Sequence, residues 1–162
     1  MQPQFVQRPE LKVVGLGAKF ISGISPDKNN AAVIPPLFDR FINQIDQIKN
    51  KTGDGSWGLV EMLPADEKSH RDELFYIAAA EVSDVDSIPP GMISRVIPAG
   101  RYAQFTHKGK LTGLEATMKF IYQTWVPQSG QRLRNSPHLE RYDRRFDLNS
   151  DQSEFDILLP VA

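Results

Sequence analysis

The feature that most constrains this chain is an order of elements that occurs twice. Setting Pro9 against Pro98 places Val13-Val14 opposite Tyr102-Ala103, and each pair follows a proline turn. Each half then continues with a loop, one helical segment and two strand-like segments. We therefore expect one domain over residues 1–162, built from two strand–helix–strand–strand modules at about residues 1–83 and 90–162. This is an α+β fold with antiparallel sheets.

The helix of the first module is expected to start at Pro35-Pro36, because proline at a first helical position lacks an N–H that would be unbonded there anyway. Apolar residues then recur at helical spacing, which predicts one buried face. These residues are Leu37, Phe38, Phe41, Ile42, Ile45 and Ile48. Gly53 to Gly55 end the segment, and strands are predicted at 57–62 and 74–82.

The helix of the second module carries a capping-box signal, since Thr112 is followed three residues later by Glu115. Pro127 is expected to end this helix, because a proline inside a helix removes a hydrogen bond. The expected buried stripe consists of Leu114, Met118, Ile121, Tyr122 and Trp125. Two closing strands are predicted at 139–143 and 155–161.

Composition excludes several classes of protein. A chain of 162 residues is long enough for a core, because domains of this size bury roughly 70% of their unfolded surface. A net charge of −1 argues against a grip on DNA or on an anionic membrane. Without cysteine there are no disulfides, thiolate metal ligands or cysteine nucleophiles. No secretory signal or bilayer-spanning stretch is present, so we expect a cytoplasmic protein without a membrane partner.

Motifs for cofactors and for common catalytic sites are incomplete. Gly15-Leu16-Gly17 lacks the third glycine of a dinucleotide-binding loop, because Phe20 stands in its place. The histidines are far apart, and the chain has no Gly-x-Ser-x-Gly nucleophile motif. The two predicted helices are too far apart to form a helix-turn-helix. We therefore expect no cofactor, no metal ion and no direct nucleic-acid binding.

Three sequence pieces in the second half carry a family resemblance. They are the hairpin over 97–103, the helix end over 124–130 and the strand over 139–142, with the sequences IPAGRYA, TWVPQSG and LERY. Together and in this order they resemble the GyrI-like small-molecule-binding family, which also supplies effector-binding domains of AraC-type and drug-responsive transcription factors. The resemblance implies two modules related by a pseudo-two-fold axis, with a ligand cleft between them.

The strand over 139–142 holds the first candidate site residues. Strand alternation places His138, Glu140 and Tyr142 on one face. The resemblance implies that Glu140 is the acidic group of the cavity and that Tyr142 is its partner. A carboxylate among aromatic rings suits an aromatic or cationic small molecule. The alternative is that Glu140 pairs with Arg141 or Arg144 at the surface.

Two tryptophans are further candidates for ligand binding. Trp57 begins the strand after the first helix, and Trp125 ends the second helix, so each is either a cavity wall or a part of the core. In the final strand many family members carry a glutamate and a tyrosine, where this chain has Asp156 and Leu158. This difference affects which ligands the cavity accepts and how strongly it holds a cation.

The leading interpretation is a stand-alone, non-catalytic domain that binds an aromatic or cationic small molecule. Two alternatives stay open, both from the resemblance. One is a hydrolase of strained cyclopropane-containing toxins, with Glu140 as its catalytic residue. The other is a domain that contacts a protein partner, as gyrase-inhibitory members do.

Overall fold

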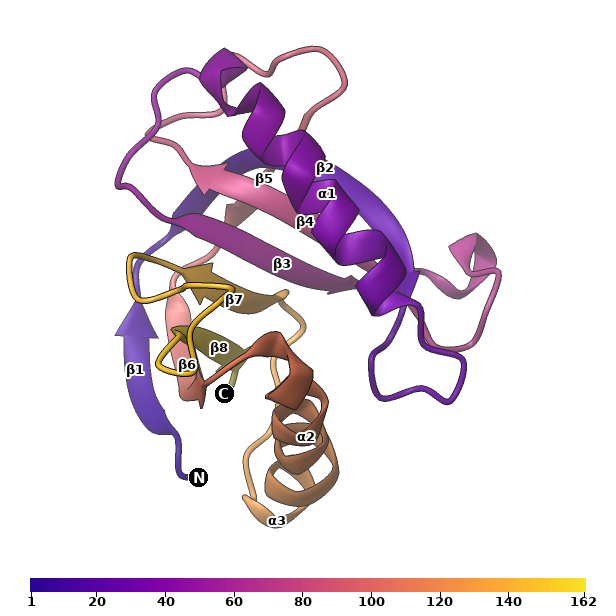
Figure 1. Ribbon diagram of the computed structural model, residues 1–162. Coiled ribbons are helices and arrows are strands. Elements are labelled where there is room, and N and C mark those ends of the chain that lie inside the picture. The colour runs from indigo at the N-terminus through magenta and orange to yellow at the C-terminus, as the bar shows by residue number, and fades with distance from the viewer.

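The structure is a computed structural model that describes residues 1–162. It contains one eight-stranded antiparallel sheet that curls into a half-barrel, together with two main helical segments (Figure 1). The strands are β1 (Gln4–Arg8), β2 (Leu11–Ile21), β3 (Ser56–Met62), β4 (Glu73–Glu81), β5 (Ile93–Ile97), β6 (Gly100–Lys108), β7 (His138–Tyr142) and β8 (Glu154–Pro160). The helices are α1 (Asn30–Gln44), α2 (Leu114–Lys119) and α3 (Val126–Gln128), and a π-helical segment (Phe120–Trp125) joins the last two. None of them is long and apolar enough to cross a membrane.

The order of the strands confirms the two-module α+β prediction. Across the sheet they run β1-β6-β8-β7-β3-β4-β2-β5, so the pair β3–β7 stands at the centre. Outward from this pair, the order β7-β8-β6-β1 on one side corresponds to β3-β4-β2-β5 on the other. Leu59 and Leu139 face each other in this central pair. The first strand of each half crosses to the other half, since β1 pairs with β6 and β5 pairs with β2. The two modules therefore share one continuous sheet.

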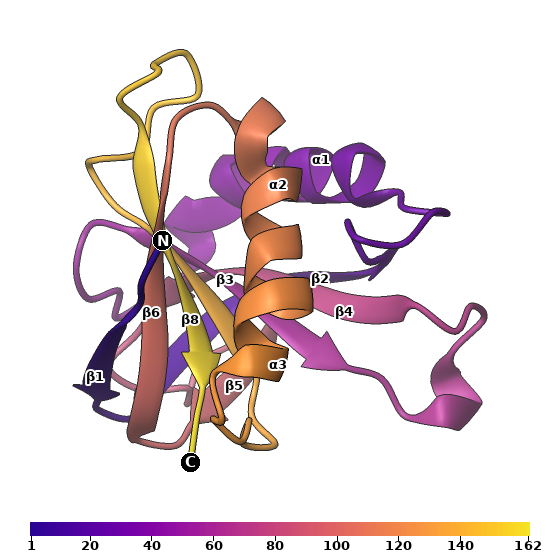
Figure 2. The ribbon, with the colours of Figure 1, turned by 90° about the horizontal axis from the view of Figure 1, so that it is seen from below.

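Both main helical segments cover the same face of the sheet (Figure 2). A row of directly opposed residues demonstrates this: Ala78, Gly58, Glu140 and Ile157 stand side by side on β4, β3, β7 and β8. Ala78 belongs to the core beneath α1, and Ile157 belongs to the core beneath α2. The opposite face has its own apolar core, which includes Leu59, Leu139 and Leu158.

The first helix differs from the prediction at its start. It begins at Asn30, so Pro35 and Pro36 lie inside it. The first turn forms ahead of the prolines because the Asn29 carbonyl accepts hydrogen bonds from the N–H groups of Ala32 and Val33, at 2.9 and 3.2 Å. The predicted buried face is wrong at one position, since 53% of the Ile42 side chain is exposed.

The second helix differs at both ends. Thr112 lies in a short 3₁₀ turn and makes no capping hydrogen bond, so the capping-box prediction is wrong. Glu115 instead pairs with Lys28 and Lys119, each at 2.7 Å. The helical segment also continues through Pro127, but only by one residue, because α3 ends at Gln128. The predicted stripe from Leu114 to Trp125 does pack against the sheet.

Substitution of Gly15 tests the packing of β2 on β4. A methyl group at Gly15 would overlap the Ala78 carbonyl oxygen and would lie 2.6 Å from the Ala79 Cα, both of which are backbone atoms. We expect Gly15→Ala to lower the free energy of unfolding by about 1–3 kcal/mol or more, as overpacked sites do. The measurement is urea denaturation. Gly113→Ala is the control, because its methyl group would meet only the His107 ring, at 3.7 Å. Equal losses for both variants would contradict the close packing.

Candidate ligand-binding site

Glu140 lies at the centre of the helix-covered face, with only 7% of its surface exposed. Its position in the middle of β7 places it between Gly58 on β3 and Ile157 on β8. Two hydroxyl groups donate hydrogen bonds to the same oxygen, Oε1: Tyr76 Oη at 2.5 Å and Tyr142 Oη at 3.3 Å. Tyr76 belongs to the first half of the chain and Tyr142 to the second. The site is therefore formed jointly by the two modules.

Gly58 creates the space for this hydrogen bond. A methyl group there would overlap the Tyr76 hydroxyl group and would lie 2.8 Å from Glu140 Oε1. Any larger residue at position 58 would therefore displace the tyrosine or the carboxylate. Gly58 is therefore required for the space that its missing side chain leaves to Tyr76 and Glu140, and not for an unusual backbone conformation.

Aromatic rings pack around the two tyrosines that bond the carboxylate. Phe38 of α1 lies edge-on to Tyr76 and to Tyr142, with ring centroids 5.9 and 5.5 Å apart. Phe155 stacks against the Tyr142 ring at 4.7 Å. Helix α1 and strand β8 thus supply the aromatic neighbours, while β4 and β7 supply the polar groups. Ring faces next to a carboxylate form a chemical environment that suits an organic cation.

The electrostatics of the site are unusual because the carboxylate has no cationic partner. No lysine, arginine or histidine forms an ion pair with Glu140, and no protein group donates a hydrogen bond to its second oxygen, Oε2. Burial raises the pKa of Glu140, and the two tyrosine hydrogen bonds oppose this rise only in part. Burial and the nearby carboxylate also raise the pKa of Tyr76 and of Tyr142 well above the usual range.

A second polar pair lies next to the carboxylate on the same face of β7. His138 Nδ1 and Tyr122 Oη, from the π-helical segment, are 2.6 Å apart. Burial lowers the pKa of His138 to about 4, so this ring is neutral at pH 7. Burial raises the pKa of Tyr122. The pair connects the second helix to the strand that carries Glu140.

The structure brings some of the predicted site residues together and separates others. Glu140 and Tyr142 are in contact, as alternation along β7 predicts. Neither Arg141 nor Arg144 pairs with Glu140: Arg141 points to the opposite face, where it lies 5.8 Å from the Trp57 ring. Trp57 is only 3% exposed and belongs to the core of that opposite face.

Trp125 lies on the helix-covered face but over other strands. Its ring packs against Phe105 of β6 and Phe5 of β1, with centroids 5.0 and 6.3 Å apart. It makes no aromatic contact with Tyr76 or Tyr142. These contacts do not test the prediction that either tryptophan binds the ligand, and the alternative is a site confined to the Glu140 cluster.

Sequence reasoning missed Tyr76, Phe38 and Gly58 as parts of the site. One signal was available for Tyr76, the single hydroxyl group in the apolar run over 74–80. Phe38 was expected only as core, and Gly58 gave no signal. Their proximity to Glu140 depends on strand pairing between the modules.

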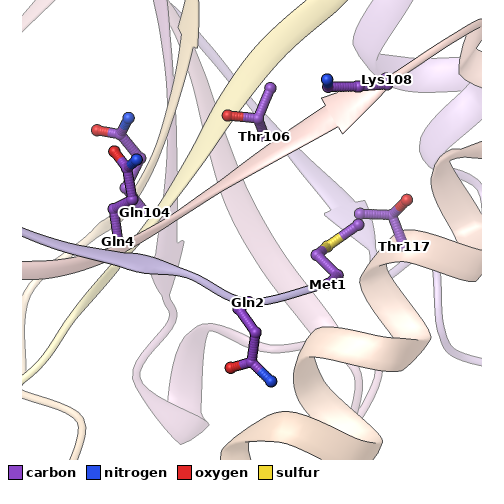
Figure 3. A pocket seen from close by; sticks show the side chains of 7 residues that line it. All are labelled: Met1, Gln2, Gln4, Gln104, Thr106, Lys108 and Thr117. Carbon is purple, nitrogen blue, oxygen red and sulfur yellow. The ribbon is translucent and has the colours of Figure 1, made fainter.

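A recess lies away from Glu140, at the edge between β1 and β6 (Figure 3). Its volume is about 440 Å³, and its walls include Gln4, Gln104 and Thr106. The charged side chain there, Lys108, already pairs with Glu154 at 3.5 Å. No group of three or more histidine, aspartate or glutamate side chains is arranged to hold a metal ion anywhere in the structure. The Glu140 cluster therefore remains the candidate site.

The comparisons with known proteins agree on one family. The sequence model of the GyrI-like small molecule binding domain matches residues 1–162. The transcriptional regulator BrlR of Pseudomonas aeruginosa is 29% identical over 163 residues, which cover 99% of this chain and 56% of BrlR. The chain thus spans about half the length of this curated relative.

Solved structures share the fold. The structure of SAV2435 bound to tetraphenylphosphonium superposes with a TM-score of 0.76 at 17% identity, covering 100% of this chain and 94% of that one. The C-terminal domain of EcmrR superposes with a TM-score of 0.65 at 23% identity, covering 99% and 97%. At these identities the likeness shows the fold alone.

Replacement of Glu140 tests the cost of its burial. A folded-state pKa above 4.5 means that the folded protein binds more protons than the unfolded chain between pH 4.5 and that raised pKa. Stability contributed by the neutral form is therefore lost as the pH rises through this window. We expect Glu140→Gln to be more stable than the wild type at pH 7, and this advantage to shrink as the pH falls to about 4.

The measurement is thermal unfolding across this pH range without ligand. Glu67→Gln is the control, because the side chain of Glu67 is exposed and makes no hydrogen bond or ion pair. A Glu140→Gln variant less stable than the wild type at pH 7 would show that the carboxylate is compensated in the unliganded protein.

Proposed function

We propose that this chain, which belongs to the GyrI-like small molecule binding domain family, binds organic cations with aromatic or apolar surfaces at the Glu140 cluster. The ligand would lie between α1 and the second helix, with its positive charge near Glu140. Tyr76, Tyr142 and Phe38 would contact its apolar parts. The proposal is for reversible binding without catalysis.

The observation that carries the proposal is a buried carboxylate without a cationic partner. Buried charges in proteins are normally paired, because an isolated charge loses its hydration. Glu140 Oε1 accepts two tyrosine hydroxyl groups, and Oε2 accepts none. A ligand cation next to Oε2 would supply the missing charge, and the surrounding rings would add cation–π attraction.

The relatives support this assignment at the level of the family. SAV2435, which shares the fold, has a structure bound to tetraphenylphosphonium, a lipophilic cation. BrlR, part of which aligns with 99% of this chain, is a transcriptional regulator. We infer that the chain acts as a ligand sensor, whose output depends on what it contacts when the site is filled.

Binding of two matched ligands tests the role of Glu140. Methyltriphenylphosphonium is cationic, and triphenylphosphine oxide is a neutral molecule of similar size. We expect Glu140→Gln to weaken binding of the cation by roughly 2–3 kcal/mol, as for contacts to charged groups, which is about 30–150-fold in Kd. The neutral ligand should lose much less, because it makes no charge–charge contact.

Isothermal titration calorimetry of both ligands against both proteins decides the matter. Since a cation favours the ionised carboxylate, binding to the wild type should also release protons near the raised pKa of Glu140. Equal losses for the two ligands, or none for either, would mean that Glu140 is not the counter-charge.

The tryptophans give a separate test of where the ligand lies. Trp125 packs on Phe105, and Trp57 lies on the opposite face, which supports a site confined to the Glu140 cluster. We expect Trp125→Phe and Trp57→Phe to leave the Kd of methyltriphenylphosphonium within about threefold of the wild type, which is less than 1 kcal/mol. The measurement is isothermal titration calorimetry, because replacing a tryptophan also changes the fluorescence of the protein. A large loss of affinity in the folded Trp125→Phe variant would extend the site towards β6.

A further inference from the structure

The Tyr122–His138 pair stands beside the proposed cation site and has no role in it so far. His138 and Glu140 are alternate residues of β7, so both side chains point to the helix-covered face. Alternate residues of a strand lie about 6–7 Å apart. A ligand that reaches Glu140 is therefore within reach of His138.

The hydrogen bond to Tyr122 determines which ring nitrogen of His138 carries the proton. Tyr122 Oη has one protein partner, His138 Nδ1 at 2.6 Å. If Nδ1 were the donor, the hydroxyl hydrogen of Tyr122 would have no acceptor in the protein, whereas donation by Tyr122 satisfies both groups. Tyr122 therefore donates to Nδ1. Because His138 is neutral at pH 7, its proton is then on Nε2.

This Nε2–H group has no acceptor in the protein, since the ring is bonded only through Nδ1. The same strand face therefore presents an unbonded acceptor, Glu140 Oε2, and an unbonded donor, His138 Nε2–H. We propose that His138 is a specificity-determining residue that donates a hydrogen bond from Nε2 to a neutral acceptor on the ligand. This inference rests on the proposed binding of cations at Glu140.

The preferred ligand class follows from the two groups. It is an apolar or aromatic cation that also carries an ether, carbonyl or similar acceptor, roughly 5–7 Å from its positive charge. A neutral imidazole suits this purpose because it donates a hydrogen bond without repelling the cation. Tyr122 is a positioning residue, since it holds the ring and its tautomer through Nδ1.

A matched ligand pair isolates this hydrogen bond. Pentyltriphenylphosphonium and (3-methoxypropyl)triphenylphosphonium have chains of equal length, and the second has an ether oxygen in place of one methylene group. We expect the wild type to bind the ether about 3–10-fold more tightly, the range of a single net hydrogen bond. In His138→Phe, which keeps a ring and removes the donor, this preference should disappear while the pentyl ligand still binds.

The outcomes separate the two proposals. If neither phosphonium binds the wild type, the proposed function fails. If both bind the wild type equally, or if His138→Phe keeps the preference for the ether, only the role of His138 is overturned. Tyr122→Phe should reduce the preference, because the tautomer is then no longer held; an unchanged preference would count against the positioning role.

Nitrogen-15 NMR of the wild-type histidine ring gives a readout that does not depend on a variant folding. The free protein should show His138 as the neutral tautomer with the proton on Nε2. Addition of the ether ligand should shift the Nε2 resonance, whereas the pentyl ligand should leave it close to its free position. A proton on Nδ1, or equal shifts with both ligands, would overturn the inference.

Discussion

The pairing of β3 with β7 is the contact on which the rest of the structure depends. It joins the two halves at Leu59 and Leu139 and converts two small modules into one eight-stranded sheet. The same register places Gly58 directly beside Glu140. A shift by one residue would turn Glu140 to the opposite face, because side chains alternate along a strand. The leucine pair on one face therefore fixes the position of the carboxylate on the other.

The pairing of β1 with β6 and of β5 with β2 also joins the two halves. Each module gives its first strand to its partner, so neither half has a complete sheet of its own. The site is shared in the same way, because Tyr76 and Phe38 come from the first half, and Glu140 and Tyr142 come from the second. The ligand proposed for this cluster would therefore contact both modules.

The site also illustrates how function and stability oppose each other. A buried carboxylate without a cationic partner is a poor contributor to stability, as the raised pKa of Glu140 indicates. The buried carboxylate of Asp156, by contrast, has a cationic partner, because Arg145 bonds both Asp143 and Asp156, at 2.9 and 2.6 Å. The absence of such a partner at Glu140 is consistent with a group that binds an external cation, since functional sites often depart from the rules that favour stability.

The sequence by itself determined the two-module order of elements and the shared face of Glu140 and Tyr142. Both are local properties, since hydrophobic periodicity and strand alternation are read within a few residues. It misplaced the start of α1 and the effect of Pro127, because first-turn hydrogen bonds and the π-helical segment depend on packing. Only the tertiary structure decided that Tyr76, Phe38 and Gly58 surround Glu140 and that Trp57 lies on the other face. These contacts join distant segments through strand pairing between the modules, which no local pattern specifies.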